Sequence, residues 1–237
     1  MISNDINKFS KPECNIYFED YICNMDKIKD ADIIKARLID SILSNSIPFP
    51  TRKKDVTIGQ EVMYGTQKLF ADLVVLSGQK LIAIEIKAYN DSFKRLKNQL
   101  EGYRRIFDYV YVVVTENHIE KLLAYPDKWF GILVMTNKGI CSKRKAKLMK
   151  EFSKEDILET IPIAYLKMVF QIKSNKLAID IRKELCMQSM AKLKNILFSY
   201  MQHKIAYKFQ NFECERGKVS HFEDVSILSM SQLIILR

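Results

Sequence analysis

Residues 70–89 read FADLVVLSGQKLIAIEIKAY, two apolar runs joined by a Ser-Gly turn. β-Branched and aliphatic residues on both sides of such a turn are typical of a β-hairpin. Asp72, Glu85 and Lys87 stand among positions that would otherwise be buried. The predicted hairpin therefore carries charges that its fold alone does not require.

The position of the turn sets which residues of the hairpin face each other. A turn centred on residues 78–79 places Leu76 opposite Leu81 and Asp72 opposite Glu85. Directly opposed side chains of an antiparallel pair have Cβ atoms about 4.5–5.5 Å apart, and like charges there are destabilising. Another group must therefore offset the repulsion between the two carboxylates.

The preceding hairpin adds a third carboxylate. With its turn centred on residues 66–67, Glu61 falls opposite Asp72 on the other side. Lys87 is two residues beyond Glu85 and so points to the same face. We therefore expect three carboxylates in line across three strands, with a lysine beside them.

A hard divalent cation is the simplest compensation, because Mg²⁺ takes carboxylate, water and phosphate oxygens. The sequence thus predicts Mg²⁺ or Mn²⁺ held by Asp72 and Glu85, with Glu61 as candidate third ligand. Lys87 beside the metal can orient a water or stabilise charge at phosphorus, as metal-assisted phosphodiester hydrolysis requires. The alternative is a solvated edge pattern of Glu85 and Lys87, with Asp72 starting a strand, since short motifs often match by chance.

The rest of residues 27–150 predicts an α/β core. Helical spacing predicts a helix over 30–44 with Asp30 as N-cap, followed by a linker over 48–54. A three-stranded antiparallel meander follows, then a helix capped by Asp91 or Ser92. Two buried strands separated by a helix complete a mixed sheet with helices on both faces. The five predicted strands are 56–64, 70–76, 81–87, 109–114 and 131–135.

The two ends of the chain differ from this core. Residues 1–26 form a poorly specified N-terminal segment, and a basic loop covers 142–150. From residue 151 to 237 we expect a helical extension without strands, and the stretch from 213 stays ambiguous. The predicted fold class is therefore α/β, a mixed sheet with an antiparallel meander flanked by helices, plus a helical C-terminal extension.

ADLVVL and IAIEIKAY together resemble the core of the PD-(D/E)XK nuclease superfamily, with Asp72, Glu85 and Lys87 at the motif positions. ADLVVL, EIKAYNDSFKRLKNQLEGYRRIFDYVYVVV and KWFGILVM resemble a group of small bacterial and phage proteins within it. The resemblance covers about residues 56–136 and implies a restriction-endonuclease-like core and a metal-dependent nuclease. Ala71 stands where many members have proline. Many members also carry an acidic residue on the first core helix, where this chain offers only Asp32 and Asp40.

Gln99 and Tyr103 lie four residues apart on the helix after the lysine strand and so share one face. They match the Q-x-x-x-Y motif of some members, which implies that they position the active site and nucleic acid. The alternative is that Tyr103 packs in the core with Gln99 at its margin.

A net charge of +10 and a pI near 9.2 favour a polyanionic partner. We expect nucleic acid, with DNA as the first choice. Several basic side chains could contact phosphates, and the alternative is that they are solvated surface charges. They are Lys94, Arg95, Lys97 and Arg104 near the helix and Lys143, Arg144 and Lys145 in the basic loop.

Other features narrow the class of protein. Five widely spaced cysteines, with no metal-binding spacing, indicate free thiols in a reducing compartment. With no leader and no apolar run that could span a bilayer, we expect a cytoplasmic protein without a membrane partner. No phosphate-binding G-x-x-x-x-G-K motif is present, which argues against ATP use. Two alternatives to a nuclease remain: a nuclease-like module that binds nucleic acid without cutting it, and a partner-binding protein that acts through its helical extension.

Overall fold

The structure, a computed structural model, describes residues 31–51 and 55–230. The expected N-terminal segment and the Asp30 cap lie outside these residues, as do residues 52–54 of the expected linker. No helix in the described part of the chain combines the length and the apolar character that crossing a bilayer requires. The cysteines in the described part of the chain, Cys141, Cys186 and Cys214, are free thiols.

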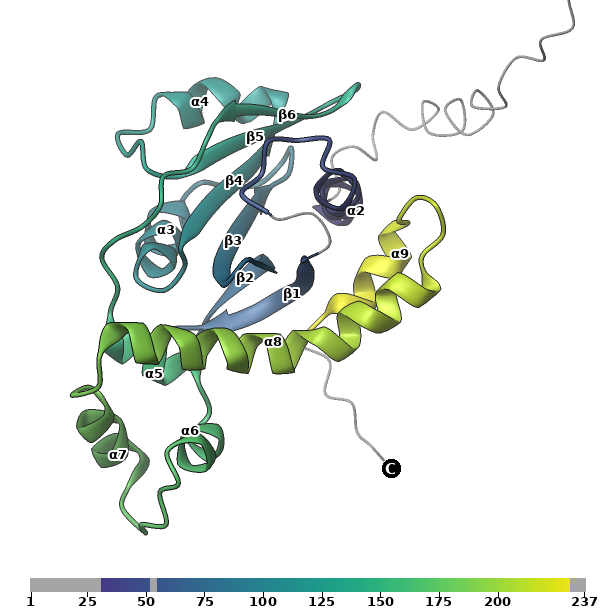
Figure 1. Ribbon diagram of the computed structural model, residues 1–237. Coiled ribbons are helices and arrows are strands. Elements are labelled where there is room, and N and C mark those ends of the chain that lie inside the picture. The colour runs from purple at the N-terminus through teal and green to yellow at the C-terminus, as the bar shows by residue number, and fades with distance from the viewer. Residues whose placement is uncertain (1–30, 52–54, 231–237) are drawn as a thin grey trace, which may run out of the picture.

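A six-stranded mixed sheet forms the centre of the molecule, with the strands in chain order from β1 to β6 (Figure 1). Strands β1 to β3 are antiparallel, β3 to β5 are parallel, and β6 returns antiparallel to β5. The predicted meander and the two further strands are confirmed. The strands are β1 (Thr57–Tyr64), β2 (Leu69–Ser77), β3 (Lys80–Lys87), β4 (Tyr109–Thr115), β5 (Gly131–Thr136) and β6 (Gly139–Arg144).

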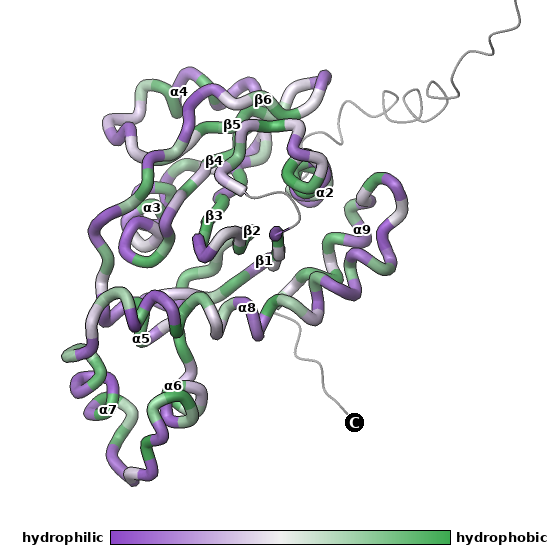
Figure 2. Tube along the Cα trace, in the orientation of Figure 1, coloured by the Kyte–Doolittle hydropathy of each residue, from purple (hydrophilic) through white to green (hydrophobic). Residues whose placement is uncertain are grey.

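Strand β6 was not predicted, and it corrects the expected basic loop. Lys143 and Arg144 lie in this strand, while Lys145 follows it. Its residues are only partly buried or exposed because it lies at the sheet edge, so its sequence lacks the apolar run that identifies an inner strand. Figure 2 shows hydrophobic colouring along the inner strands of the sheet, such as β5.

Helices cover the sheet as expected. The predicted first helix is α2 (Ala31–Leu43), and α3 (Leu96–Arg104) connects the parallel strands β3 and β4. The expected cap of α3 is wrong: Arg95 is its N-cap and makes no side-chain capping bond. Asp91 instead accepts a hydrogen bond from the Ala88 N–H at 2.8 Å, and Ser92 accepts one from the Lys94 N–H at 3.2 Å. After β4, η2 (Glu116–His118) and α4 (Ile119–Leu123) precede β5.

The C-terminal part is helical, and it packs directly on the sheet. Its longest helix, α8, runs alongside β1 (Figure 1). Gly59 permits this approach, because a Cβ there would lie 2.9 Å from Ile205 Cγ2. Sheet and helices therefore share one hydrophobic core. These elements are α5 (Lys154–Thr160), α6 (Ile163–Val169), α7 (Ala178–Leu185), α8 (Met190–Glu215), α9 (Phe222–Val225) and η3 (Ser226–Leu228).

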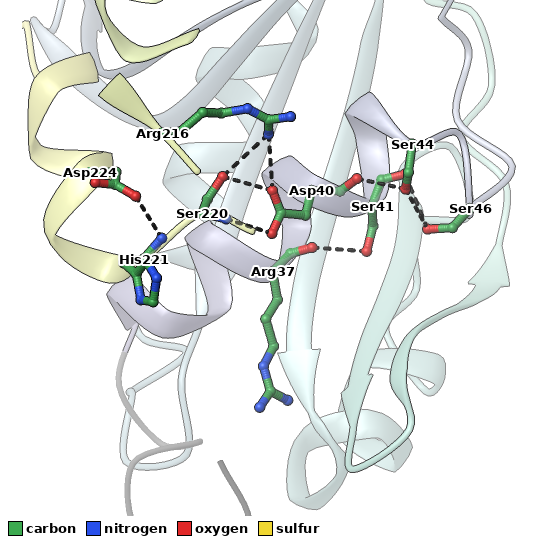
Figure 3. A network of polar contacts seen from close by, with 9 residues as sticks. All are labelled: Arg37, Asp40, Ser41, Ser44, Ser46, Arg216, Ser220, His221 and Asp224. Atoms are coloured by element: carbon green, nitrogen blue, oxygen red, sulfur yellow. Dashed lines mark hydrogen bonds and ion pairs between the residues drawn. The ribbon is translucent and has the colours of Figure 1, made fainter. Parts of the chain in front are cut away.

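A polar network joins α2 to the segment between α8 and α9 (Figure 3). The Asp40 carboxylate accepts hydrogen bonds from Arg216 Nη1 at 3.1 Å and from the Ser220 N–H and hydroxyl at 2.9 and 2.7 Å. Ser220 is buried. Asp40 therefore serves to dock the C-terminal helices onto the first core helix.

Helix α5 holds the turn between β1 and β2. Asp156 accepts hydrogen bonds from the Thr66 N–H and hydroxyl at 2.9 and 2.8 Å, and Thr160 accepts one from the Gly65 N–H. Burial alone would raise the pKa of the Asp156 carboxyl, but the bonds from Thr66 and Ser153 outweigh it and lower that pKa. The ionised carboxylate therefore stabilises the turn.

Candidate active site between β2 and β3

The site lies where two neighbouring strands stop pairing. Strands β2 and β3 pair from Ser77 with Lys80 to Leu73 with Ile84, in the register predicted from the turn. Beyond this point β2 continues its pairing with β1, while the end of β3 pairs with β4. The fork between the strands begins at the level of Asp72 and Glu85, which is where the sequence placed two opposed carboxylates.

Asp72 fills the start of this fork. Its Oδ2 accepts a hydrogen bond from the Ile86 N–H at 2.7 Å, where the strand ladder would otherwise continue. Burial and then the charge of Glu85 raise the pKa of Asp72 to about 7, while the Ile86 bond and the cations Lys35 and Lys87 act in the opposite direction. The repulsion expected from the sequence is thus present at this side chain.

Glu85 and Lys87 form a buried ion pair. The exposed fractions of the two residues are 2% and 4%, and Lys87 Nζ donates to Glu85 Oε1 at 2.7 Å. Lys87 Nζ also donates to Gln99 Oε1 at 3.2 Å, and the Tyr103 hydroxyl donates to Glu85 Oε2 at 2.5 Å. A buried charge is tolerable only when it is paired and hydrogen-bonded in this way. The alternative of a solvated edge pattern is therefore wrong for these two residues.

Helix α3 supplies both Gln99 and Tyr103 to the cluster. Tyr103 is fully buried and stacks on Tyr64 with ring centroids 4.9 Å apart. Burial, followed by the charge of Glu85, raises the pKa of the Tyr103 hydroxyl well above its usual value, so the group stays a proton donor. Tyr103 is thus a core residue that also holds a charged partner. The core-packing interpretation is confirmed for Tyr103, whereas a role of the Q-x-x-x-Y pair in positioning an active site stays a prediction.

Sequence reasoning missed Lys35 on α2. This lysine is buried, its Nζ donates to Asp32 Oδ1 at 3.0 Å, and its charge lowers the pKa of Asp72. The available signal was a lysine inside the apolar run DIIKARLI, where a charge needs a nearby partner.

The expected line of three carboxylates is wrong, because Glu61 does not form a metal-holding group with Asp72 and Glu85. Glu61 Oε2 accepts a hydrogen bond from the Ser229 hydroxyl at 2.7 Å. The backbone at Glu61 has a φ of 51°, outside the extended region on which the predicted alternation of faces depends. Across residues 31–51 and 55–230 no three His, Cys, Asp or Glu side chains are arranged to hold a metal.

The basic residues fall into two separate groups. Lys94, Arg95 and Lys97 are exposed around the start of α3, next to the end of β3. Strand β6 lies three strands from β3, roughly 14 Å away at the usual strand spacing. The basic residues of β6 therefore do not adjoin the cluster.

Two arginines of the expected set are engaged within the protein. Arg144 donates through Nε to the Phe130 carbonyl at 2.9 Å, and its guanidinium lies 4.5 Å from the Phe130 ring centroid. Arg104 lies 3.5 Å from carboxylate oxygens of both Glu101 and Glu151. Arg144 is thus a structural residue, whereas the partly exposed Arg104 belongs to a surface ion-pair network.

Fold and site together define a mixed α/β protein with a buried carboxylate–lysine cluster at a fork in its sheet. The chain belongs to the bacteriophage P4 protein cII family, whose family model matches residues 25–229. No curated protein sequence matches it significantly. A solved structure with some likeness is the SPO1766 protein of unknown function from Silicibacter pomeroyi, 15% identical over 52% of this chain and 85% of that chain. Its TM-score of 0.34 is too low to say anything about fold or function.

Proposed function

We propose that this protein is a metal-dependent nuclease that hydrolyses phosphodiester bonds, with DNA as its substrate and Mg²⁺ or Mn²⁺ as its cofactor. The observation that carries the proposal is the convergence of Asp72, Glu85 and Lys87 at the fork between β2 and β3. The element order α2, β1, β2, β3, α3, β4 supports it, because it agrees with the core that the PD-(D/E)XK resemblance implies.

The donor set at the fork suits a hard divalent cation. Asp72 and Glu85 offer carboxylate oxygens, and Mg²⁺ is commonly bound by one or two carboxylates with waters and phosphate oxygens. Burial and then the charge of Glu85 raise the pKa of Asp72, and a cation bound beside both carboxylates would offset the cost of burying these two like charges. When bound, the metal would polarise the phosphoryl group and lower the pKa of a coordinated water.

The chain's own residues then have distinct tasks. Lys87 is held by Glu85 and Gln99, so its ammonium is positioned to orient the attacking water or to stabilise negative charge at phosphorus. Tyr103 holds Glu85 from the other side and keeps that carboxylate in place. Gln99 and Tyr103 thus act as positioning residues.

A second candidate function is nucleic-acid binding without cleavage. It is favoured by one observation, namely that the described residues contain no group of three acidic or histidine side chains suited to a metal. Positive net charge and the basic start of α3 support binding under either function. The free thiols of the described cysteines agree with a reducing, cytoplasmic location, which is part of the proposal.

The test is a cleavage assay on end-labelled single-stranded and duplex DNA and RNA, with Mn²⁺, with Mg²⁺ and with chelator. The parent should cut at least one DNA substrate only when metal is present. Asp72→Asn, which keeps the shape of the side chain and its acceptor for the Ile86 N–H, should bind the same substrates without cutting them. Binding by the parent without cleavage on any substrate in either metal would favour the second function.

A further inference from the structure

Two exposed aromatic rings adjoin the buried cluster. Phe70 is 51% exposed and Tyr89 is 44% exposed. Phe70 precedes Asp72 by two residues on β2, and Tyr89 follows Lys87 by two residues, so each lies within about 7 Å of the cluster along the chain. The Tyr103 hydroxyl lies 3.5 Å from the Phe70 carbonyl oxygen, which ties Phe70 to the Glu85 carboxylate.

Exposure of large aromatic rings is unusual among the residues that the structure describes. Most of its phenylalanine and tyrosine side chains in the described residues are buried or half-buried. Only two other aromatic side chains there are similarly exposed, one on α8 and one on α9. These are Tyr207 and Phe222. Two of the four exposed rings in the described residues therefore lie on the chain segments that carry Asp72 and Lys87.

Both rings stand on well-anchored backbone. Phe70 is paired with Met63 in the ladder between β1 and β2. The Tyr89 carbonyl accepts a hydrogen bond from Asn117 Nδ2 at 3.0 Å, and the preceding Ala88 N–H donates to Asp91 Oδ2. Binding to such pre-positioned rings costs little conformational entropy, because the backbone is already ordered.

Positive charge lies beside the rings. Lys94, Arg95 and Lys97 are exposed and follow Tyr89 within eight residues. Asn98 Nδ2 donates to Gln67 Oε1 at 3.1 Å, which places the start of α3 against the turn that leads into β2 and Phe70. Flat apolar rings and exposed cations together suit a polymer with flat bases and anionic phosphates.

We propose that Phe70 and Tyr89 stack against unpaired bases next to the reacting phosphate, so that the substrate is a single strand or an unpaired segment of DNA. This inference rests on the proposed nuclease function and names its substrate class. In a continuous duplex the bases already stack on each other, whereas a single strand offers free base faces to aromatic side chains. The cations around the start of α3 contact the phosphates of the same strand.

The experiment measures fluorescence anisotropy of a labelled mixed-sequence single strand and of its duplex, in chelator so that neither is cut. The variants are Phe70→Leu and Tyr89→Leu, which remove the ring but keep an apolar side chain. The matched controls are Tyr207→Leu and Phe222→Leu, which remove exposed rings elsewhere. Each site variant should lose roughly 5- to 150-fold in single-strand affinity, the equivalent of about 1–3 kcal/mol per stacked base. Duplex affinity and the two controls should change little.

Two results would overturn the inference: site variants that bind the single strand as tightly as the parent, or losses that are equal for duplex and single strand. Both can occur while metal-dependent cleavage persists, in which case the nuclease proposal survives alone. Conversely, selective loss of single-strand affinity in a protein that cuts nothing would support the stacking surface and reject the nuclease.

Discussion

Replacing Asp72 by asparagine should stabilise the metal-free protein. Asparagine has the same shape and still offers an oxygen to the Ile86 N–H, which is 2.7 Å from Asp72 Oδ2. It removes the negative charge that faces Glu85 in a partly buried position. The substitution therefore removes a cost of folding while it keeps the hydrogen bond at the fork.

The size of the effect follows from the pKa of Asp72, about 7 in the folded protein against 3.8 for a free aspartate. The folded protein keeps a proton that the unfolded chain releases, so stability is lost as the pH rises from about 4 through 7. At 1.36 kcal/mol per pKa unit the full cost is about 4 kcal/mol at pH 8 and about 2 kcal/mol at pH 5. Solvent contact with the partly exposed side chain reduces these figures.

The assay is a thermal melt of parent and Asp72→Asn in chelator at pH 5 and pH 8. Each kcal/mol corresponds to about 2–4 °C for a chain of this length. The variant should melt above the parent at pH 8, and its advantage should shrink at pH 5. Added Mn²⁺ should raise the melting temperature of the parent more than that of the variant, because a ligand that binds only the folded state stabilises it by RT ln(1 + [L]/Kd), which is larger for tighter binding. A variant that melts below the parent at pH 8, or whose advantage does not depend on pH, would refute the reasoning.

Three further predictions concern Lys35, Asp156 and the binding of DNA. Lys35→Met should lower the melting temperature in chelator more at pH 8 than at pH 5, because it removes a cation that lowers the pKa of Asp72. In an Asp72→Asn background this pH dependence should vanish. Asp156→Ala should cost about 1.5–3 kcal/mol in a denaturant titration at pH 7, since two hydrogen bonds from Thr66 lose a charged acceptor. Its lowered pKa means that this contribution is present above about pH 4 and disappears as the pH falls further, so parent and variant should converge in acid. DNA affinity should fall with salt, by a slope of roughly −0.9 in log K per phosphate contact for duplex, and an affinity that is flat with salt would remove nucleic acid as a partner.

The registers of both hairpins could be predicted because a strand repeats every two residues and a turn fixes the pairing. The observed pairs Leu76–Leu81 and Gln60–Leu73 follow the predicted registers. The buried status of Glu85 and Lys87 was also foreseeable, since both stand inside an apolar run.

What could not be predicted depends on contacts distant in sequence or on local backbone departures. Glu61 leaves the expected line because its φ is positive and because Ser229, 168 residues later, binds its carboxylate. Lys35 joins the site through the packing of α2, which a pattern within the hairpin does not encode. Strand β6 is a polar edge strand, so its sequence resembles a loop.

The measurement that tests the central claim most directly is the single-turnover rate of DNA cleavage in Mn²⁺ by the parent, by Lys87→Ala and by Lys218→Ala. Lys218 is an exposed lysine between α8 and α9 and serves as the matched control. Melting curves should accompany the rates, because removing Lys87 leaves Glu85 as a buried charge without its cation. With folded protein in each reaction, Lys87→Ala should be slower than the parent by about 10²–10³-fold, and Lys218→Ala should match the parent. A folded Lys87→Ala that cuts as fast as the parent would contradict the account.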